Sequence, residues 1–344
     1  MMGNRILFIG ENWHGSNATS CKRALRHLGC DVYDIDDYHY WPVWQSGSMR
    51  AIRRLLRVWI TREFGNTVRC MGETFQPELV FVFKGVMVRP ETLVALRAGG
   101  ARLFNFYPDW DFGEFYHQFN NDFLDCMRLY DVLFTPKSYN IERFRENAVR
   151  RVEFLPYAFD PWCHYPVGVS GQEQTRYQTD IAFIGSWGRS RAELLESLVE
   201  SKFPYRLSIW GNNWQRLDPV SPLRKYCRFV PAYGETQAKI LACSKIALAF
   251  LRPPDLHTAR TFEIPAQGAF MLAERSSEHT QFFQDGIEIA CFSDVSELRE
   301  KIDYYLHHDS DRQQIAQAGY MHVTQGGHSY VDRMRQVLQI YHEM

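Results

Sequence analysis

The sequence lacks most of the features that would assign a protein to a specialised class. Its 344 residues carry a formal net charge of −1 at pH 7, so no overall field attracts nucleic acid and we expect no nucleic-acid partner. The eight cysteines are scattered singly, without a C-x-x-C pair or a zinc-site spacing, which predicts free thiols. The N-terminus lacks the apolar region of a signal peptide, and no run approaches the roughly 20 apolar residues of a membrane span. We therefore expect a cytoplasmic protein.

Motifs of common nucleotide-dependent enzymes are also missing. The absence of G-x-G-x-x-G argues against a dinucleotide enzyme, and the absence of G-x-x-x-x-G-K-[ST] argues against a P-loop NTPase. No D-x-D motif lies in a loop suited to hold a metal. We expect no cofactor and no metal site.

What the chain does contain is a repeated alternation of short apolar runs and helical patterns. In the first half, runs such as RILFIG (5–10) and ELVFVFKG (78–85) alternate with helical stretches, which is the βαβ rhythm of a parallel sheet. The rhythm stops in a polar, aperiodic stretch and restarts with DIAFIG (180–185). We predict a first domain at 1–163, a linker at 164–178, a second domain at 179–327 and a C-terminal helix at 328–344.

The two halves begin in the same way. RILFIG and DIAFIG each read as a strand that ends in glycine and leads through a loop into a helix. Ligands of open α/β sheets bind outside the carboxyl ends of the strands. We therefore predict an α/β fold with two Rossmann-like domains that face each other across a cleft. The alternative is two such domains with no ligand between them.

Charged residues precede an apolar strand in the stretch PDLHTARTFEIPAQGAFMLAE (254–274). Asp255, Arg260 and Glu263 would be costly to bury unless each charge has a partner. The group is therefore either a structural ion pair between Arg260 and Glu263, three residues apart on a helix, or a ligand site.

The stretch from Arg260 to Gly319 resembles the C-terminal domain of GT-B glycosyltransferases, in particular the CgeB-like (spore maturation protein) group. The agreement includes R-x-F-E ahead of a glycine, an apolar strand, a helix ending in FFQDG, the strand IEIACF and a helix near DRQQIAQAG. FLPYAFDP (154–161), AFIGSW (182–187) and IWGNNW (209–214) are also similar. The likeness is strong over roughly 150–335 and weak over 1–150.

The resemblance implies roles for the charged stretch. Retaining enzymes of this kind have an E-x7-E motif, and Glu263 matches its second position, whereas Asp255 stands at the first and departs from the pattern. Glu263 would hold the ribose of a nucleotide-sugar and Asp255 the sugar, because a carboxylate accepts hydrogen bonds from two vicinal hydroxyls. Arg260 would anchor the helix or meet a phosphate, and His257 is a further donor-binding candidate.

The growing charge of the leaving diphosphate requires a metal, or else cationic side chains and a helix N-terminus. Arg189 and Arg191 start a predicted helix, and Arg191, near the position of the family's lysine, is expected to act in catalysis as well as in donor binding. Ser186 stands where related enzymes have an arginine. For the base, we expect a pocket at two consecutive strand ends in 209–214 and 229–234, with the candidates Gly211, Val230, Ala232 and Tyr233.

In the first domain, the loop 11–20 is expected to point into the cleft, and Gly15 would let the backbone approach the donor. His14 and Asp109 compete as candidates for a catalytic base, which an inverting enzyme needs. A retaining enzyme can use the leaving phosphate instead. The alternative for His14 and for Asp109 is that neither side chain takes part in catalysis or binding.

Two further predicted helices, at 48–64 and 328–344, concern the contacts that the first domain makes. Residues 48–64 form a basic amphipathic pattern, with Ile52, Leu55, Leu56, Trp59 and Ile60 on one face. This helix either rests on anionic lipid, which would place the protein at the inner face of a membrane, or grips an anionic acceptor, or packs on its own domain. By resemblance, the helix at 328–344 crosses back to the first domain.

We therefore expect a metal-independent GT-B glycosyltransferase that retains the anomeric configuration. The donor would be a nucleotide-sugar, with a UDP-sugar favoured by family frequency. The acceptor would be a glycan, a lipid-linked glycan, a protein or a small molecule. The alternatives are a sugar-nucleotide epimerase of the UDP-N-acetylglucosamine type and a non-catalytic glycan-assembly subunit.

Overall fold

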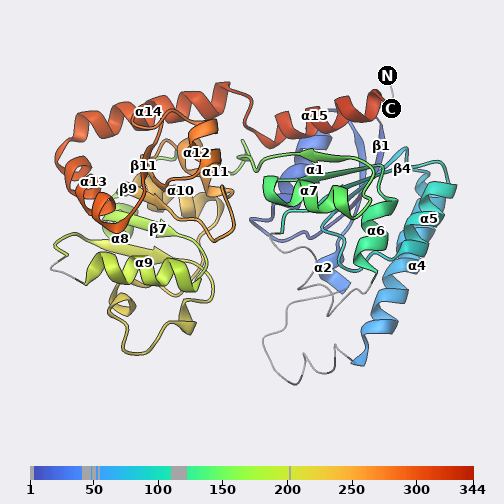
Figure 1. Cartoon of the computed structure of the whole chain (residues 1–344), viewed down its shortest axis with the longest axis horizontal. Coiled ribbons are helices and arrows are strands. Elements are labelled where there is room, and N and C mark those ends of the chain that lie inside the picture. Colours follow the sequence, from blue (N-terminus) through green and yellow to red (C-terminus); the bar gives the residue numbers. More distant parts are fainter. Residues whose placement is uncertain (1–3, 41–47, 49–51, 53–54, 110–121, 201–202) are drawn as a thin grey trace. The chain divides into compact units, whose positions relative to one another are not determined.

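The computed structural model describes residues 4–40, 48, 52, 55–109, 122–200 and 203–344 (Figure 1). The chain divides into two compact units. The first unit consists of Met1–Pro156 and Arg333–Met344, and the second of Tyr157–Asp332. No helix of the described residues combines the length and the apolar character needed to cross a membrane.

The first unit is built on a parallel sheet of six strands in the order β2-β1-β3-β4-β5-β6 (Figure 1). The strands are β1 (Arg5–Ile9), β2 (Asp31–Ile35), β3 (Leu79–Phe83), β4 (Arg102–Phe106), β5 (Val132–Thr135) and β6 (Val152–Phe154). The helices include α1 (Asn17–His27), α2 (Asp37–Tyr40), α4 (Arg57–Phe75), α5 (Pro90–Ala98), α6 (Phe123–Leu129) and α7 (Ser138–Glu146).

The second unit has a parallel sheet of five strands in the order β11-β10-β9-β7-β8. The strands are β7 (Thr179–Ile184), β8 (Leu207–Trp210), β9 (Ser244–Ala249), β10 (Met271–Glu274) and β11 (Ala290–Phe292). The α-helices are α8 (Gly171–Tyr177), α9 (Arg189–Val199), α10 (Gly234–Ala242), α11 (Arg260–Ala266), α12 (Ser277–Phe282), α13 (Val295–His307) and α14 (Asp309–Gln325). The 3-10 turns η2 (Trp214–Arg216) and η3 (Pro222–Tyr226) follow β8.

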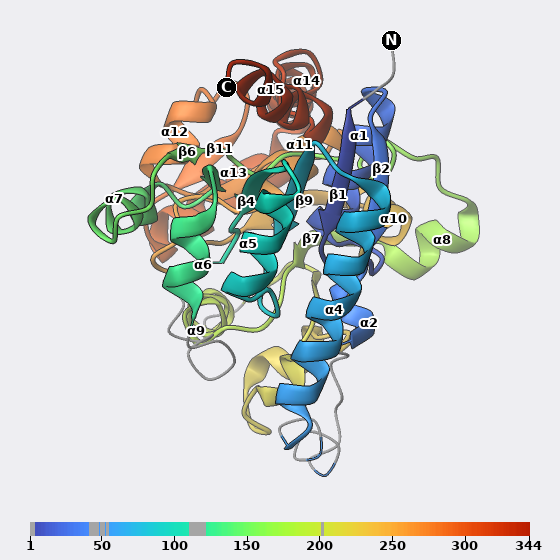
Figure 2. The ribbon, with the colours of Figure 1, turned by 90° about the vertical axis from the view of Figure 1, so that its right-hand side faces the viewer.

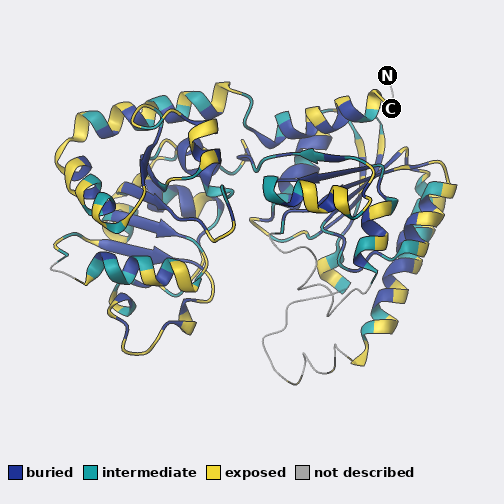
Figure 3. Ribbon diagram, in the orientation of Figure 1, coloured by how far each residue is buried: buried dark blue, intermediate teal, exposed yellow. Residues whose placement is uncertain are grey.

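The apolar strands form the core of each unit. All five residues of β3, LVFVF, are buried, as expected where helices cover both faces of a parallel sheet. The burial colours of Figure 3 follow this arrangement, with dark strands and helices that are buried along one side. The predicted α/β class with two parallel sheets is confirmed.

In each sheet the strand order reverses at the first strand, which has neighbours on both sides. In the first unit β1 pairs with β2 on one side and β3 on the other, and in the second unit β7 pairs with β8 and β9. Loops that follow two such strands leave in opposite directions and open a crevice at the carboxyl ends, where α/β proteins bind ligands. The loops after β1 and β3, and after β7 and β9, are therefore the places to look for a site.

Two local elements differ from the sequence expectation. The predicted linker at 164–178 lies inside the second unit and contains α8. Ser170 and Glu173 form a capping box that begins this helix, and the helix has no buried residue, so apolar periodicity could not indicate it. The strand expected at 227–234 is reduced to a single bridge between Ile209 and Cys227.

The last helix, α15 (Tyr330–His342), runs from the second unit into the first. Met334 and Val337 are completely buried. The ring of Tyr341 lies 6.3 Å from that of Phe104 on β4, and His342 Nε2 lies 2.9 Å from Asn4 Nδ2. The final residues of the chain thus complete the packing of the first sheet.

Met334→Ala should lower the free energy of unfolding of the first unit by about 2–5 kcal/mol, because it empties a filled apolar site. Hydrogen exchange of peptides from β1 and β4 should become faster, while β7 in the second unit keeps its protection. Met321→Ala, at a position that is 39% exposed on α14, is the matched control and should change little. Unchanged exchange of β1 and β4 in the Met334 variant would contradict this packing.

Candidate functional site

The carboxyl ends of β7, β9 and β10 carry a group of charged side chains. Arg191 lies in the first turn of α9, directly after β7, and Arg252 and Asp255 follow β9. Glu274 ends β10, and Arg260 opens α11. Burial, with the positive charges of Arg252 and Arg260, lowers the pKa of Arg191 to about 10, against the opposing effect of the two carboxylates. The edge beside the switch point therefore brings three arginines together with two carboxylates.

Glu263 on α11 is the buried anion of this edge, with 4% of its surface exposed. Its Oε2 accepts hydrogen bonds from Arg260 Nη1 and, at 3.3 Å, from Gln237 Nε2. Gln237 on α10 also accepts from Arg260 and donates to Gln267 Oε1 at 3.0 Å. Arg260 Nε donates to the carbonyl of Ile184 at 3.1 Å. One buried network thus joins β7, α10 and α11.

His164 faces the other oxygen of the same carboxylate. Its Nδ1 accepts the backbone N–H of Asp160 at 2.9 Å, so the proton of a neutral ring resides on Nε2. Nε2 lies 3.8 Å from Glu263 Oε1. Burial alone would raise the pKa of Glu263, but Arg260, His164 and the hydrogen bond from Gln237 outweigh it and lower the pKa. Glu263 is therefore ionised, and its ion pair with Arg260 is formed.

The start of α9 is open to an anion. Its N-cap is Gly188, and no side chain caps the helix or places an acid in its first turn. Arg191 donates from Nε, Nη1 and Nη2 to the carbonyls of Leu251, Ser186 and Phe250, each at 3.2 Å. Arg189 and Ser186 are exposed, and Arg189 makes no ion pair with the described part of the chain. The free backbone N–H groups of a helix start favour negative charge.

The two remaining candidates of the charged stretch lie in different surroundings. Asp255 is 7% exposed, and its Oδ2 lies 4.0 Å from Arg252 Nε. His257 is 1% exposed and uses both ring nitrogens inside the unit. Its Nε2 accepts from the backbone N–H of Tyr157 at 3.2 Å, and its Nδ1 pairs with Glu278. His257 is therefore a buried structural residue of the segment between β9 and α11, whereas Asp255 belongs to the charged group around Arg191.

The residues expected around the base come together at the end of β8. Gly211 N–H donates to the carbonyl of Val230 at 2.9 Å, and Asn212 Nδ2 donates to Tyr233 Oη at 2.6 Å. Gly211 has φ +149°, and a Cβ there would lie 1.9 Å from the carbonyl oxygen of Gly185. Val230 is 48% exposed, whereas Ala232 is buried. The loop after β8 is thus held against the loop after β7.

In the first unit, the loops after β1, β3 and β4 meet through Lys84. Lys84 Nζ lies 3.8 Å from Glu11 Oε2 and 4.0 Å from Asp109 Oδ1. Burial would lower the pKa of Lys84, but Asp109, Glu11 and Asp37 raise it. Burial, assisted by the negative charge of Glu11, raises the pKa of Asp37 to about 7. Asp109 is thus an ion-paired member of a charged cluster at the switch point of the first sheet.

The other two candidates of the first unit belong to the loop between β1 and α1. His14 is exposed. Gly15 is also exposed and has φ +91°, a conformation that glycine adopts readily. Residues 110–121, which follow Asp109, lie outside the described residues.

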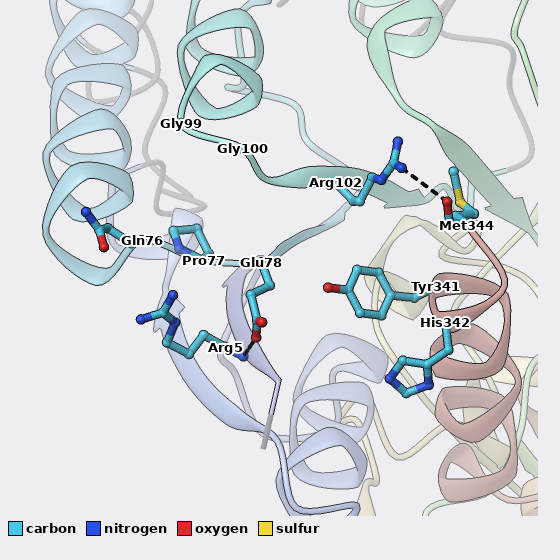
Figure 4. Close-up of a pocket in the computed structure, with 10 residues that line it drawn as sticks. All are labelled: Arg5, Gln76, Pro77, Glu78, Gly99, Gly100, Arg102, Tyr341, His342 and Met344. Atoms are coloured by element: carbon cyan, nitrogen blue, oxygen red, sulfur yellow. Dashed lines mark hydrogen bonds between the residues drawn. The ribbon is translucent and has the colours of Figure 1, made fainter. Parts of the chain in front are cut away.

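A hollow of about 610 Å³ lies at the opposite edge of the first sheet (Figure 4). It is lined by residues that precede or begin β1, β3 and β4, among them Arg5, Glu78 and Arg102, together with Tyr341 and His342 of α15. In Figure 4 the side chains of Tyr341 and His342 point toward this space. Because ligands of α/β sheets bind at the carboxyl ends of strands, this hollow is not the candidate site.

Sequence reasoning missed several members of the network around Glu263. Gln237 and His164 come from segments far from it in the chain, and neither belongs to a motif that the resemblance carried. Gln267, whose Nε2 is buried without a hydrogen bond to the described residues, lies one helical turn after Glu263 of the recognised R-x-F-E motif. Asn212 lies inside IWGNNW, and its neighbour Gly211 was a candidate. Only these last two could have been found from local sequence.

Arg260→Met should destabilise the protein by about 3 kcal/mol at pH 7, because it leaves Glu263 buried without its cation. The lowered pKa of Glu263 contributes stability above its ordinary value of 4.5, and this contribution is lost as the pH falls through the lowered value. The difference between variant and parent should therefore shrink in urea unfolding as the pH is taken below 4.5. Arg216→Met, at an exposed arginine of the same unit, is the control. A difference independent of pH would argue against the ion pair.

Residues 189–339 match the model of the glycosyl transferase-like family. The spore protein CgeB of Bacillus subtilis is 22% identical over 265 residues, which are 72% of this chain and 78% of CgeB. Within the described residues, no group of three or more histidines, cysteines, aspartates or glutamates is placed to hold a metal ion.

Solved structures share the fold over the whole chain. Sucrose-phosphate synthase of Thermosynechococcus elongatus has a TM-score of 0.70 at 14% identity, covering 99% of this chain and 98% of that one. HepE of Anabaena, solved in complex with UDP, has a TM-score of 0.66 at 11% identity, covering 99% and 100%. UDP-N-acetylglucosamine 2-epimerase of Neisseria meningitidis is more distant, with a TM-score of 0.53 at 10% identity over 99% and 100% of the chains. Together the family match over 189–339 and the CgeB relative support a glycosyltransferase, and the solved structures show that the chain has the GT-B fold.

Proposed function

We propose that the protein transfers a sugar from a nucleotide-sugar, preferably a UDP-sugar, to an acceptor without a metal and with retention of the anomeric configuration. The observation that carries the proposal is the uncapped start of α9, with Arg189 exposed and Arg191 held in its first turn. A UDP-sugar is favoured because HepE was solved with UDP and with UDP-glucose.

The diphosphate would bind at the start of α9. The leaving group gains negative charge as the glycosidic bond to the sugar breaks, and fixed donors that face this charge lower the barrier. Arg191 is held by three carbonyls and keeps further N–H donors for a phosphate oxygen. Arg189 is exposed and can approach the same anion without breaking an existing ion pair in the described chain. These side chains and the helix start would do the work of a divalent metal.

The ribose would bind at Glu263. Its Oε2 is engaged by Arg260 and Gln237, but Oε1 accepts no hydrogen bond from the described residues. A ribose hydroxyl that donates to Oε1 would replace a weak contact with His164 at 3.8 Å by a charge-assisted hydrogen bond. The ion pair with Arg260 and the ribose contact are therefore compatible, because they use different oxygens.

The base would lie against the loop after β8. Tyr233 offers a ring face, and its hydroxyl is fixed by Asn212 at 2.6 Å. Backbone groups near Val230 and Ala232 would reach the edge of the base. Gly211 keeps this loop close to the one that leads into α9, so that base and diphosphate can belong to one nucleotide.

Retention is proposed because the leaving phosphate can itself accept the proton of the acceptor, in which case no base is required from His14 or Asp109. Asp255 would then accept hydrogen bonds from sugar hydroxyls beside Arg191. NMR of the product tests this, and the same anomeric configuration is expected in donor and product. An inverted product would contradict retention and would require a base such as His14 or Asp109.

An epimerase is the competing function, because UDP-N-acetylglucosamine 2-epimerases share the fold at lower similarity. The protein should be incubated with a panel of sugar nucleotides and with polysaccharide, lipid-linked, protein and small-molecule acceptors. Glycosyl transfer yields free nucleotide and a new glycoside, whereas an epimerase yields an interconverted sugar nucleotide. No turnover with any pair, together with tight nucleotide binding, would favour a non-catalytic subunit.

Arg189→Ala should weaken UDP binding about tenfold or more, the scale of one charge-assisted hydrogen bond, while uridine binds as before. Calorimetry in a chelating buffer measures both, and the parent should bind UDP equally well with and without chelator. Arg216→Ala is the matched control, since both arginines are exposed on the second unit. UDP affinity that collapses with chelator and returns with Mg²⁺ would refute the metal-free site.

A further inference from the structure

The first residues of α4 and the described residues just before it expose large apolar side chains, which we call the apolar tip. Leu55, Val58 and Trp59 are 83%, 77% and 64% exposed. Ile52 and Leu56 are 51% and 47% exposed. Leu56 N donates to Ile52 O at 3.0 Å, and Ile60 N donates to Leu56 O at 2.9 Å. Five such side chains together differ from the scattered exposed apolar residues of ordinary surfaces.

The apolar tip is not the face that α4 packs on its own unit. Thr61, Phe64, Gly65 and Val68 form the buried side of the helix. Figure 3 shows the same change along α4, which is dark toward the sheet and yellow at the end where the helix begins. Of the three alternatives for this helix, packing on its own domain does not hold for residues 52, 55, 56 and 59, because the buried stripe begins only after them. Ile60, the last residue of the same face, is partly buried against the core of the first unit.

Positive charge adjoins the apolar tip. Val58 also lines a hollow of about 410 Å³, whose charged lining residues are three arginines and two carboxylates, Arg62, Arg69, Arg89, Glu91 and Asp122. Arg89 is paired with Asp122 at 2.6 Å, and Arg69 donates to Asn66 at 2.5 Å. Arg62 is exposed and makes no ion pair with any residue that the structure describes. Burial and the positive charge of Arg89 lower the pKa of Arg57, against the opposing effect of Asp122.

We propose that the apolar tip and the arginines beside it dock the protein on an anionic phospholipid bilayer. The apolar side chains can enter the acyl region of a membrane surface, while the arginines beside them contact the phosphates of the headgroups. Arg62 and the neighbouring hollow would contact lipid phosphates, while Val58 and Trp59 enter the interface. The proposal is independent of the donor site in the second unit.

A second copy of the chain fits this surface less well. A symmetric contact places the same patch on both partners, so the arginines of one tip would face those of the other. A protein partner would need a larger surface, because stable interfaces bury about 800 Å² on each side, and the tip is the end of a single helix. A bilayer supplies both negative charge and a deformable apolar phase.

Flotation of the full chain with vesicles tests the proposal. Vesicles of phosphatidylcholine with 30% phosphatidylglycerol, about a third anionic lipid, should carry the protein, and pure phosphatidylcholine vesicles should not. Binding should weaken between about 0.1 M and 0.5 M salt, because salt screens exposed charges. Equal binding to both kinds of vesicle, or binding to neither, would overturn the proposal.

Matched variants locate the contact. Val58→Ser should lower the vesicle partition coefficient at least about tenfold, the scale of withdrawing one valine from the apolar phase, whereas Val220→Ser, at a position 87% exposed on the second unit, should not. Arg62→Gln should lower it about fivefold, the scale of one cation near an anionic surface, and Arg150→Gln, also exposed, is its control. Equal losses in variant and control would remove the tip from the contact.

Light scattering of the protein in solution distinguishes a lipid surface from a second copy of the chain as the partner of the apolar tip. The parent and Val58→Ser should have the same mass, because the tip is expected to bind lipid and not a second copy. A concentration-dependent dimer that Val58→Ser dissolves, without selective flotation, would make the tip an interface between chains and overturn the membrane proposal.

Discussion

The second unit depends on the neutralisation of one buried carboxylate. Glu263 is almost completely enclosed, and it stays ionised because Arg260, Gln237 and His164 reach it from separate parts of the chain. Each partner is held by a further contact, such as that of Arg260 with the carbonyl of Ile184 at the end of β7. The charge that would be costly alone therefore fixes α10, α11 and the segment before α8 relative to the sheet.

Parallel strands impose a second constraint, because all of their carboxyl ends meet at one edge and their loops compete for space. Gly211 resolves this after β8, because a Cβ there would collide with the carbonyl oxygen of Gly185 in the loop after β7. Trp187 N–H then donates to Asn212 O at 2.8 Å, and Trp214 Nε1 donates to Gly185 O at 2.9 Å. The approach brings the start of α9 beside the loop after β8, which are the places proposed for the diphosphate and the base.

The sequence allowed the fold class to be predicted because strands buried on both faces appear as continuous apolar runs. It could not indicate α8, because none of its residues is buried and no apolar periodicity results. It also could not show whether the apolar face predicted at 48–64 is buried, because periodicity identifies an apolar face but not what covers it. For the candidate site, a family motif pointed to Arg260 and Glu263. Gln237 and His164 remained hidden, since contacts between distant segments leave no local pattern. The cluster around Lys84 was missed for the same reason, although Asp109 was a candidate.

The chain leaves the first unit after Pro156 and re-enters it at Arg333, and these two passages are joined side by side. Phe159 pairs with Ser329, Phe159 N–H donates to His328 O at 3.2 Å, and Tyr330 N–H donates to Phe159 O at 2.9 Å. The second unit is therefore an insertion in the first, with its own two ends held together. A domain with adjacent ends tolerates circular permutation, so a short peptide that joins residue 332 to residue 157 could move the chain termini elsewhere in this half without breaking its sheet.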